Sequence, residues 1–175
     1  MTRLFVVVLL TVVLAAVACH PSLSTFDKQV NNLIHERCSF DEPCQITVGE
    51  ATNFDWDEIY VFRPGLTAGD VEAILPAAKG FHGEFNRKMA FLKQGHLVKL
   101  DEAPEIIEGE NTPPGMLFFE DSPDNDDCLR YPRDAEFKVK QESWSQGNIY
   151  KLACANCQTP PVFAGFGSRA GNSQP

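Results

Sequence analysis

The chain has 175 residues, of which 43% are hydrophobic, and its 24 acidic and 15 basic side chains give a net charge of −9 at pH 7. This length is enough for one domain with a real hydrophobic core. So strong a negative charge repels nucleic-acid phosphates and anionic lipid surfaces, which argues against a DNA or RNA partner.

The first 18 residues have the composition of a secretory signal peptide. Arg3 precedes an apolar run over residues 4–16, and small residues stand one and three positions before Cys19. The run is too short to favour a membrane-spanning helix. Cleavage before Cys19 leaves 157 of the 175 residues and, because Arg3 is lost, moves the net charge from −9 to −10.

Cys19 stands at the position of the lipidated cysteine of bacterial lipoproteins. Residues 14–19, "LAAVAC", resemble a lipobox, although Ala16 occupies a position where Leu is usual. An ordinary signal peptidase would cut the same bond, so two outcomes stay open. We expect lipidation of Cys19 and, because His20 rather than an aspartate follows it, an anchor in the outer membrane of a Gram-negative cell, facing the periplasm. Without the lipid, the protein would be secreted to the periplasm.

Cysteine pairing bears on the same question. An oxidising compartment favours disulfides, but the five cysteines beyond Cys19 cannot all pair with one another. Either Cys19 is lipidated and one thiol is left over, or six cysteines form three bridges. Cys38 and Cys44 close a short loop bent by a proline and are the expected local pair. Cys128 is then expected to pair with one member of the closing Cys-x-x-Cys motif. These five cysteines are Cys38, Cys44, Cys128, Cys154 and Cys157.

The Cys154-Ala-Asn-Cys157 motif has two other interpretations. Its spacing is that of thioredoxin-like redox motifs, but it lacks their aromatic flank and their strand-to-helix context. Zinc binding is also disfavoured, because the spacing of Cys38 and Cys44 does not suit a zinc knuckle and the compartment does not favour free thiolates. We expect structural disulfides, with no bound metal and no cofactor.

Two helices are predicted. Ser24 can cap the first, with Asp27 as the acidic half of a capping box. Apolar residues then recur at helical spacing up to residue 37. Thr67 and Asp70 are placed to open the second helix in the same way, and it ends at Pro76. The apolar residues of the first stripe are Phe26, Val30, Leu33 and Ile34.

Strand-forming residues follow the first helix. Residues 58–62, "EIYVF", form an unbroken apolar strand, which predicts that both of its faces are covered. Residues 79–87 look irregular, and a hairpin turning at Gln94-Gly95 follows. The other expected strands cover residues 45–49, 115–121, 135–141 and 148–154. Together these elements predict an α+β fold in which one antiparallel sheet carries both helices on one face. The single domain spans 19–157, and the tail 158–175, rich in Pro, Gly and Ser, is predicted to be disordered.

The stretch 53–65, "NFDWDEIYVFRPG", contains two aspartates that flank a tryptophan before a strand. Asp55 and Asp57 could converge as a general acid and base, but glycoside cleavage needs carboxylates several ångströms apart across a sugar. The structural interpretation is simpler: Phe54 and Trp56 fill the core, while an aspartate accepts hydrogen bonds from turn amides or from Arg63. We therefore predict that this corner, which leads into the strand containing Tyr60, has a structural role.

Three segments carry a resemblance: "FDWDEIYVFRPGLTAGDVEAIL", "FLKQGHLVKL" and "FFEDSPDNDDCLRYPRDAEFKV". They resemble a loosely defined group of small bacterial secreted proteins and lipoproteins, in which a Phe-x-Trp-Asp corner leads into a Tyr-Val-Phe strand. The resemblance covers about residues 45–142. It implies a compact extracytoplasmic domain of unassigned role and transfers no catalytic residue.

Motifs of known chemistry are missing from the sequence. It has no nucleophile elbow, phosphate-binding glycine loop, His-Glu-x-x-His zinc motif or dinucleotide fingerprint. The stretch 121–127 superficially resembles a calcium loop but lacks its central glycine and closing glutamate. His35, His82 and His96 are scattered and fit surface or packing roles. No catalytic residue is therefore predicted.

Two function classes remain. We favour a non-enzymatic lipoprotein of the cell envelope that binds a protein or envelope partner and meets the membrane only through its lipid. The alternative is a small envelope hydrolase acting on glycan or ester substrates. Residues 101–127 hold ten acidic and no basic side chains, which suits either a solvated loop or a docking face for a basic protein partner. The acids expected at that face are Asp121, Asp124, Asp126 and Asp127.

Overall fold

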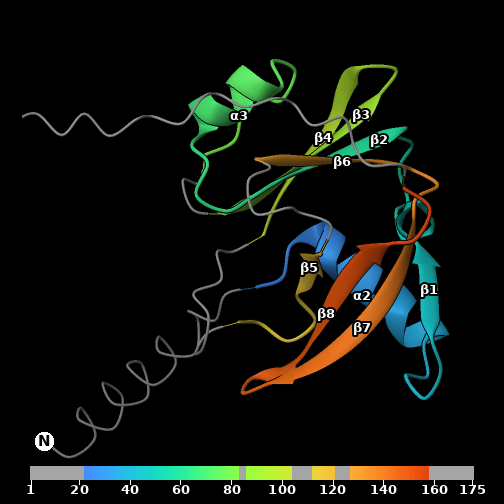
Figure 1. The fold of residues 1–175 in the computed structure, drawn as a ribbon. Helices are drawn as coiled ribbons and strands as arrows, with labels where there is room; N and C mark the ends of the chain where they lie inside the picture. The colour runs from blue at the N-terminus through green and yellow to red at the C-terminus, as the bar shows by residue number, and fades with distance from the viewer. Residues whose placement is uncertain (1–21, 83–85, 104–111, 121–126, 158–175) are drawn as a thin grey trace, which may run out of the picture.

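The computed structural model describes residues 22–82, 86–103, 112–120 and 127–157, which form an α+β fold (Figure 1). The predicted signal peptide, Cys19, Asp121, Asp124, Asp126 and the tail 158–175 lie outside these residues. The elements are α2 (Thr25–Arg37), β1 (Cys44–Thr47), the short 3₁₀ helix η1 (Val48–Glu50), β2 (Glu58–Phe62), α3 (Ala68–Ile74), β3 (Arg87–Lys93), β4 (His96–Ala103), β5 (Leu117–Phe119), β6 (Cys128–Pro132), β7 (Glu136–Trp144) and β8 (Gly147–Cys154).

The strands form two four-stranded sheets, so the prediction of a single sheet is wrong. One sheet has the order β1-β7-β8-β5 and the other β4-β3-β2-β6. All of the pairings are antiparallel except that of β5 with β8, which is parallel. Strand β6 follows β5 in the sequence but belongs to the other sheet, where it pairs with β2, about 70 residues earlier.

Strand β2 is buried on both faces, as its unbroken apolar sequence predicts. Successive side chains of a strand point to opposite faces. Ile59 and Val61 belong to a large core that also contains α2 and the other sheet. Tyr60 and Phe62 belong to a smaller core with α3 and the segment that follows it. Each face of this sheet is therefore apolar and must be packed against another element of the fold.

The two helices provide that cover from opposite sides, so the prediction that both pack on one face is also wrong. Figure 1 shows α3 on one side of β2, β3 and β4, and α2 on the other side beside the second sheet. The predicted apolar stripe of α2 is fully inside the large core. Helix α3 contributes Val71, which is 0% exposed, to the smaller core. Among the described helices, none is long and apolar enough to cross a membrane.

The helix caps agree in part with the sequence. Thr67 and Asp70 form the predicted reciprocal capping box at α3. At α2, the Ser24 hydroxyl accepts a hydrogen bond from the Asp27 amide at 3.0 Å, as expected of the N-cap. The carboxylate of Asp27, however, bonds to the Arg87 guanidinium, while it stays beside the Ser24 side chain. The prediction of a reciprocal box at α2 is therefore wrong, because Asp27 binds a partner 60 residues away.

The start of strand β3 and the whole of strand β6 were not predicted. Residue 87, assigned above to an irregular segment, begins β3, and its next residue Lys88 is 0% exposed with its ammonium bonded to the Leu66 carbonyl at 2.7 Å. Strand β6 carries Arg130 and ends at Pro132, which hides its strand character in the sequence. It forms because its alternate residues Leu129 and Tyr131 enter the large core.

Two disulfides are present. Cys38 bonds to Cys44, the pair expected from the short loop. Cys154 bonds to Cys157, so the expectation that Cys128 pairs with one of them is wrong. Cys128 lies in β6 of the other sheet, where its Sγ is 3.7 Å from the Leu129 carbonyl oxygen. All four bonded cysteines pack against the large core.

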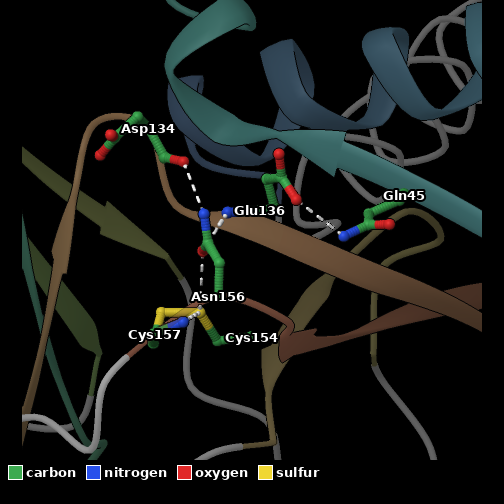
Figure 2. Close-up of a disulfide and its surroundings, with 6 residues drawn as sticks. All are labelled: Gln45, Asp134, Glu136, Cys154, Asn156 and Cys157. Carbon is green, nitrogen blue, oxygen red and sulfur yellow. Dashed lines mark hydrogen bonds between the residues drawn. A yellow bond between two sulfur atoms is a disulfide. The ribbon is translucent and has the colours of Figure 1, made fainter.

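The Cys154–Cys157 loop is fastened to the connection between β6 and β7 (Figure 2). The Asn156 side chain donates a hydrogen bond to the Asp134 carbonyl at 3.2 Å and accepts one from the Glu136 amide at 2.9 Å. This loop follows a strand and begins no described helix, so it lacks the helix dipole that lowers thiol pKa values in many redox motifs. Its geometry supports a structural role.

Replacing Cys154 and Cys157 together by Ser should therefore leave the domain folded. Because the bond closes a loop of only four residues, its loss should lower the free energy of unfolding by about 2 kcal/mol. Urea unfolding of the two oxidised proteins, followed by tryptophan fluorescence, measures this difference. A variant that cannot fold would show that this disulfide has a larger role than closing a loop.

Candidate functional site

The corner at residues 54–57 is built around Trp56. This side chain is 0% exposed, and its indole nitrogen donates a hydrogen bond to the Thr52 hydroxyl at 2.7 Å. Its ring meets the Phe91 ring edge-on, with centroids 5.4 Å apart. Phe54 is half-buried and meets the same ring at 5.1 Å. Both aromatic side chains therefore anchor the corner to β3.

The two aspartates of the corner face different partners. Asp55 forms ion pairs with Lys93 and with Arg133, the latter at 2.7 Å. The Asp57 carboxylate accepts a hydrogen bond from the Gln94 amide at 2.7 Å, in the β3–β4 turn. Gln94 has a positive φ of 51°, which is uncommon for a residue other than glycine, and Asp57 helps to hold it there. The pair is thus engaged in structural contacts on both sides.

Arg63 and Tyr60 do not join this corner. Of the two partners predicted for the aspartates, the turn amide is present, because the Gln94 amide bonds to Asp57, whereas Arg63 forms an ion pair with Asp127 at 2.7 Å instead. Burial raises the pKa of the Tyr60 hydroxyl, and the nearby Arg130 guanidinium opposes the rise. Asp127, which was predicted to belong to an acidic docking face, thus has Arg63 as an intramolecular partner.

A polar groove beside the corner has a volume of about 590 Å³. Two of its carboxylates already have partners: Glu50 pairs with Arg37, and Asp57 binds the β3–β4 turn. Arg133 is bound by Asp55. The residues that line the groove are Thr47, Gly49, Glu50, Thr52, Trp56, Asp57, Arg133 and Asp134.

An apolar recess lies where β2, β3 and β6 of one sheet meet β5 of the other. Its volume is about 170 Å³, and its walls are mostly aliphatic and aromatic, with Arg63 and Arg87 as the two charged residues among those that line it. Arg63 and Pro64 are exposed, so they form its solvent side. The lining residues are Val61, Phe62, Arg63, Pro64, Arg87, Met116, Leu117, Phe118, Phe119 and Leu129.

Arg87 is the buried polar group of the apolar recess. It is 6% exposed, and its two terminal nitrogens donate hydrogen bonds to the Leu117 carbonyl and the Asp27 carboxylate. Its Nε and the second Asp27 carboxylate oxygen have no hydrogen-bond partner. The guanidinium carbon also lies 5.7 Å from the centre of the Phe119 ring.

The Asp27–Arg87 pair is buried on both sides, with side-chain exposures of 0% and 7%. Burial raises the pKa of the Asp27 carboxyl, and the adjacent Arg87 charge opposes that rise. An ion pair in such a place loses much of its Coulomb energy to desolvation, so it is weak evidence of a large contribution to stability. The pair fixes the guanidinium against the recess.

The sequence did not reveal the Asp27–Arg87 ion pair. Its members come from separate elements, and only Asp27 had been singled out, for capping. A usable signal was the pair of basic residues, Arg87 and Lys88, directly before the apolar run "MAFL".

The three histidines within the described residues do not lie together. His35 lies against Tyr150, with its Nε2 3.3 Å from the phenol oxygen, whereas His82 and His96 are exposed. Within the ranges that the structure describes, there is no cluster of three or more side chains able to hold a metal ion.

The described residues thus define a small two-sheet α+β domain with a polar groove and an apolar recess. Comparison of the chain with protein-family models, with curated proteins and with solved structures found no match.

Trp56→Ala should lower the free energy of unfolding by about 3–5 kcal/mol, because it empties a fully buried aromatic site. Asp55→Asn should cost less than about 1 kcal/mol, since Asp55 is 61% exposed and its ion pairs are screened by water. Thermal melts of both variants test this. An unchanged melting temperature for Trp56→Ala would contradict the structural role of the corner.

Removing one member of the buried pair should be costly. Asp27→Asn leaves the Arg87 charge uncompensated in the interior, which we expect to cost about 3–5 kcal/mol. The double variant Asp27→Leu with Arg87→Met removes both charges and should be more stable than Asp27→Asn. Urea unfolding curves give the comparison, and a double variant less stable than the single one would contradict it.

Proposed function

We propose that the mature protein is a non-enzymatic binding protein of the cell envelope and that the apolar recess is its binding site. The observation that carries this proposal is a hollow lined by apolar side chains around one buried polar group. Small-molecule sites generally have this composition.

The proposed location rests on the sequence and the cysteines. The signal peptide and Cys19 direct the protein out of the cytoplasm and onto a lipid anchor in the outer membrane. The two disulfides support an oxidising compartment, since such bonds are rare in the cytosol.

The hydrolase alternative would use the polar groove. Hydrolysis of glycans needs one carboxyl group to donate a proton and another to act as base or nucleophile. Of the three acidic residues that line the groove, Glu50 and Asp57 are engaged by Arg37 and by the Gln94 amide, so Asp134 would lack the second free carboxyl group that the reaction needs. The groove therefore supports an enzyme less well than the recess supports a binding protein.

A basic protein partner remains a secondary part of the proposal. Of the four acids predicted at the docking face, Asp127 pairs with Arg63, beside the apolar recess. A partner there would have to compete with that ion pair.

Leu129→Trp should abolish binding at the recess, because the indole occupies the space now left by the smaller side chain on the edge strand β6. Native mass spectrometry of the soluble domain, incubated with a neutral organic extract of cell envelopes, should detect a small bound mass that this variant loses. Leu97→Trp is the matched control, since Leu97 is half-buried in β4 and does not line the recess.

Two results of that experiment would contradict the proposal. One is the absence of any bound mass on the unmodified domain. The other is a bound mass that Leu129→Trp retains while its near-ultraviolet circular dichroism remains native.

The anchor is tested separately. Cys19→Ser should move the protein from the membrane fraction to the soluble periplasmic fraction, because no acyl chains can then be attached. An unmodified protein that is already soluble, and whose N-terminal peptide carries no acyl mass, would show that Cys19 is not lipidated.

A further inference from the structure

Little chain separates the proposed lipid anchor from the folded domain. Leu23 lies against Gly115, since a Cβ atom at that glycine would be 3.2 Å from the Leu23 Cδ1 atom. Cys19 stands four positions before Leu23, and four residues of chain span at most about 14 Å. That span is no longer than the radius of gyration of a domain of this size, which is about 14 Å. A lipid on Cys19 would therefore hold the end of the domain around Leu23 and Gly115 at the surface of the bilayer.

The turn of the β7–β8 hairpin lies at the same end of the domain. The Gly115 amide donates a hydrogen bond to the Asn148 carbonyl at 2.7 Å, and a Cβ atom at Gly147 would be 2.9 Å from Pro114 Cβ. Across the hairpin, Gly147 pairs with Trp144. Figure 1 shows the chain entering α2 on the same side of the molecule as this turn. Trp144 is thus close to the point from which the anchor extends.

Trp144 and Phe118 form an aromatic pair on the outer face of the sheet β1-β7-β8-β5. Their ring centroids are 5.6 Å apart, and both side chains are half-buried, so part of each ring is open to solvent. Phe137 of β7 and Leu117 of β5 enter the large core, where α2 also packs. Because side chains alternate along a strand, Trp144 and Phe118 point away from that core. An indole suits a membrane–water interface, since its ring is apolar and its N–H is polar.

The charge of this outer face is balanced, unlike that of the whole chain. Lys140 and Lys151 each pair with Glu142 at 3.0 Å. Three lysines and three glutamates of the described residues alternate onto this face or pair with its lysines, so it lacks the excess that gives the chain its charge of −9. Lysine stems can also cover apolar surface while their ammonium groups reach lipid head groups. The charged residues are Lys138, Lys140, Lys151, Glu120, Glu136 and Glu142.

We propose that the outer face around Trp144 and Phe118 rests on the bilayer that carries the Cys19 lipid, with both rings in the head-group region. This rests on the lipid anchor proposed above and adds a contact between the membrane and the domain itself. The short tether favours a lipid surface over a protein at this face, because a protein would have to fit between the domain and the bilayer. The opposite side of the molecule, with α3, then faces away from the membrane.

The test uses the two tryptophans of the chain as reporters. The mature chain is attached to phosphatidylcholine vesicles through a hexahistidine tag placed directly before Cys19 and a nickel-chelating lipid. Half of the vesicles contain phosphatidylcholine that is brominated near the head of one acyl chain, which quenches an indole at the interface. Trp56 is 0% exposed, so the quencher reports on Trp144. Comparing the two kinds of vesicle cancels any quenching by nickel.

We expect the emission lost on brominated vesicles to be at least about threefold larger for the unmodified mature chain than for Trp144→Phe, which retains only Trp56. Trp144→Phe combined with Ala73→Trp is the matched control, because Ala73 is exposed on α3. Its new indole should be quenched no more than Trp56 is. Near-ultraviolet circular dichroism of each variant confirms that the fold is kept.

Two results would overturn the proposed docking face. Equal losses of emission for the unmodified chain and Trp144→Phe would show that Trp144 does not meet the lipid. A loss as large for the Ala73→Trp control would show that the tethered domain has no preferred face. Because the tag supplies the tether, neither result depends on acylation of Cys19. The fractionation of Cys19→Ser and the ligand experiment at the recess therefore test the proposed function separately.

Discussion

The buried ion pair between Asp27 and Arg87 joins the three layers of the domain. Asp27 belongs to α2, Arg87 begins β3, and the same guanidinium binds the Leu117 carbonyl in β5 of the other sheet. One planar cation thus holds a helix and both sheets in register, a task for which its fork of donors is well suited. The apolar recess lies beside this junction, and Arg87 is one of its lining residues.

The corner at residues 54–57 also links separate elements, in this case at the surface. Asp55 links Lys93 of β3 to Arg133, which follows β6, and Asp57 secures the turn between β3 and β4. Trp56 fixes the corner from inside through its contact with Phe91. The carboxylates of Asp55 and Asp57 are held by these partners. The Asp-Trp-Asp pattern, which could suggest an acid and base pair, therefore has a structural explanation. The binding that we propose is assigned to a hollow that the sequence pattern did not indicate.

Several local features were predictable from short stretches. The apolar stripe of α2, the Thr67–Asp70 capping box, the Gln94-Gly95 turn and the Cys38–Cys44 pair all depend on residues within a few positions of each other. The apolar recess could not be predicted from any short stretch, because its walls come from four strands and its buried polar group, Arg87, begins one of them. Arg87 and Lys88 at the start of β3 also read as solvent-facing charges, yet both are buried by contacts with distant segments.

The sequence by itself determined that the chain has an α+β composition, that β2 needs cover on both faces, and that its charge disfavours nucleic acid. These conclusions follow from local periodicity and from summed charge, which do not depend on how elements are arranged. Only the tertiary structure decided that there are two sheets, that the helices lie on opposite sides of one of them, and that Cys154 bonds to Cys157. Strand partners and buried ion pairs are chosen by which apolar faces and which charges meet in space. Residues as far apart as Asp27 and Arg87 leave no mark of that meeting in the sequence.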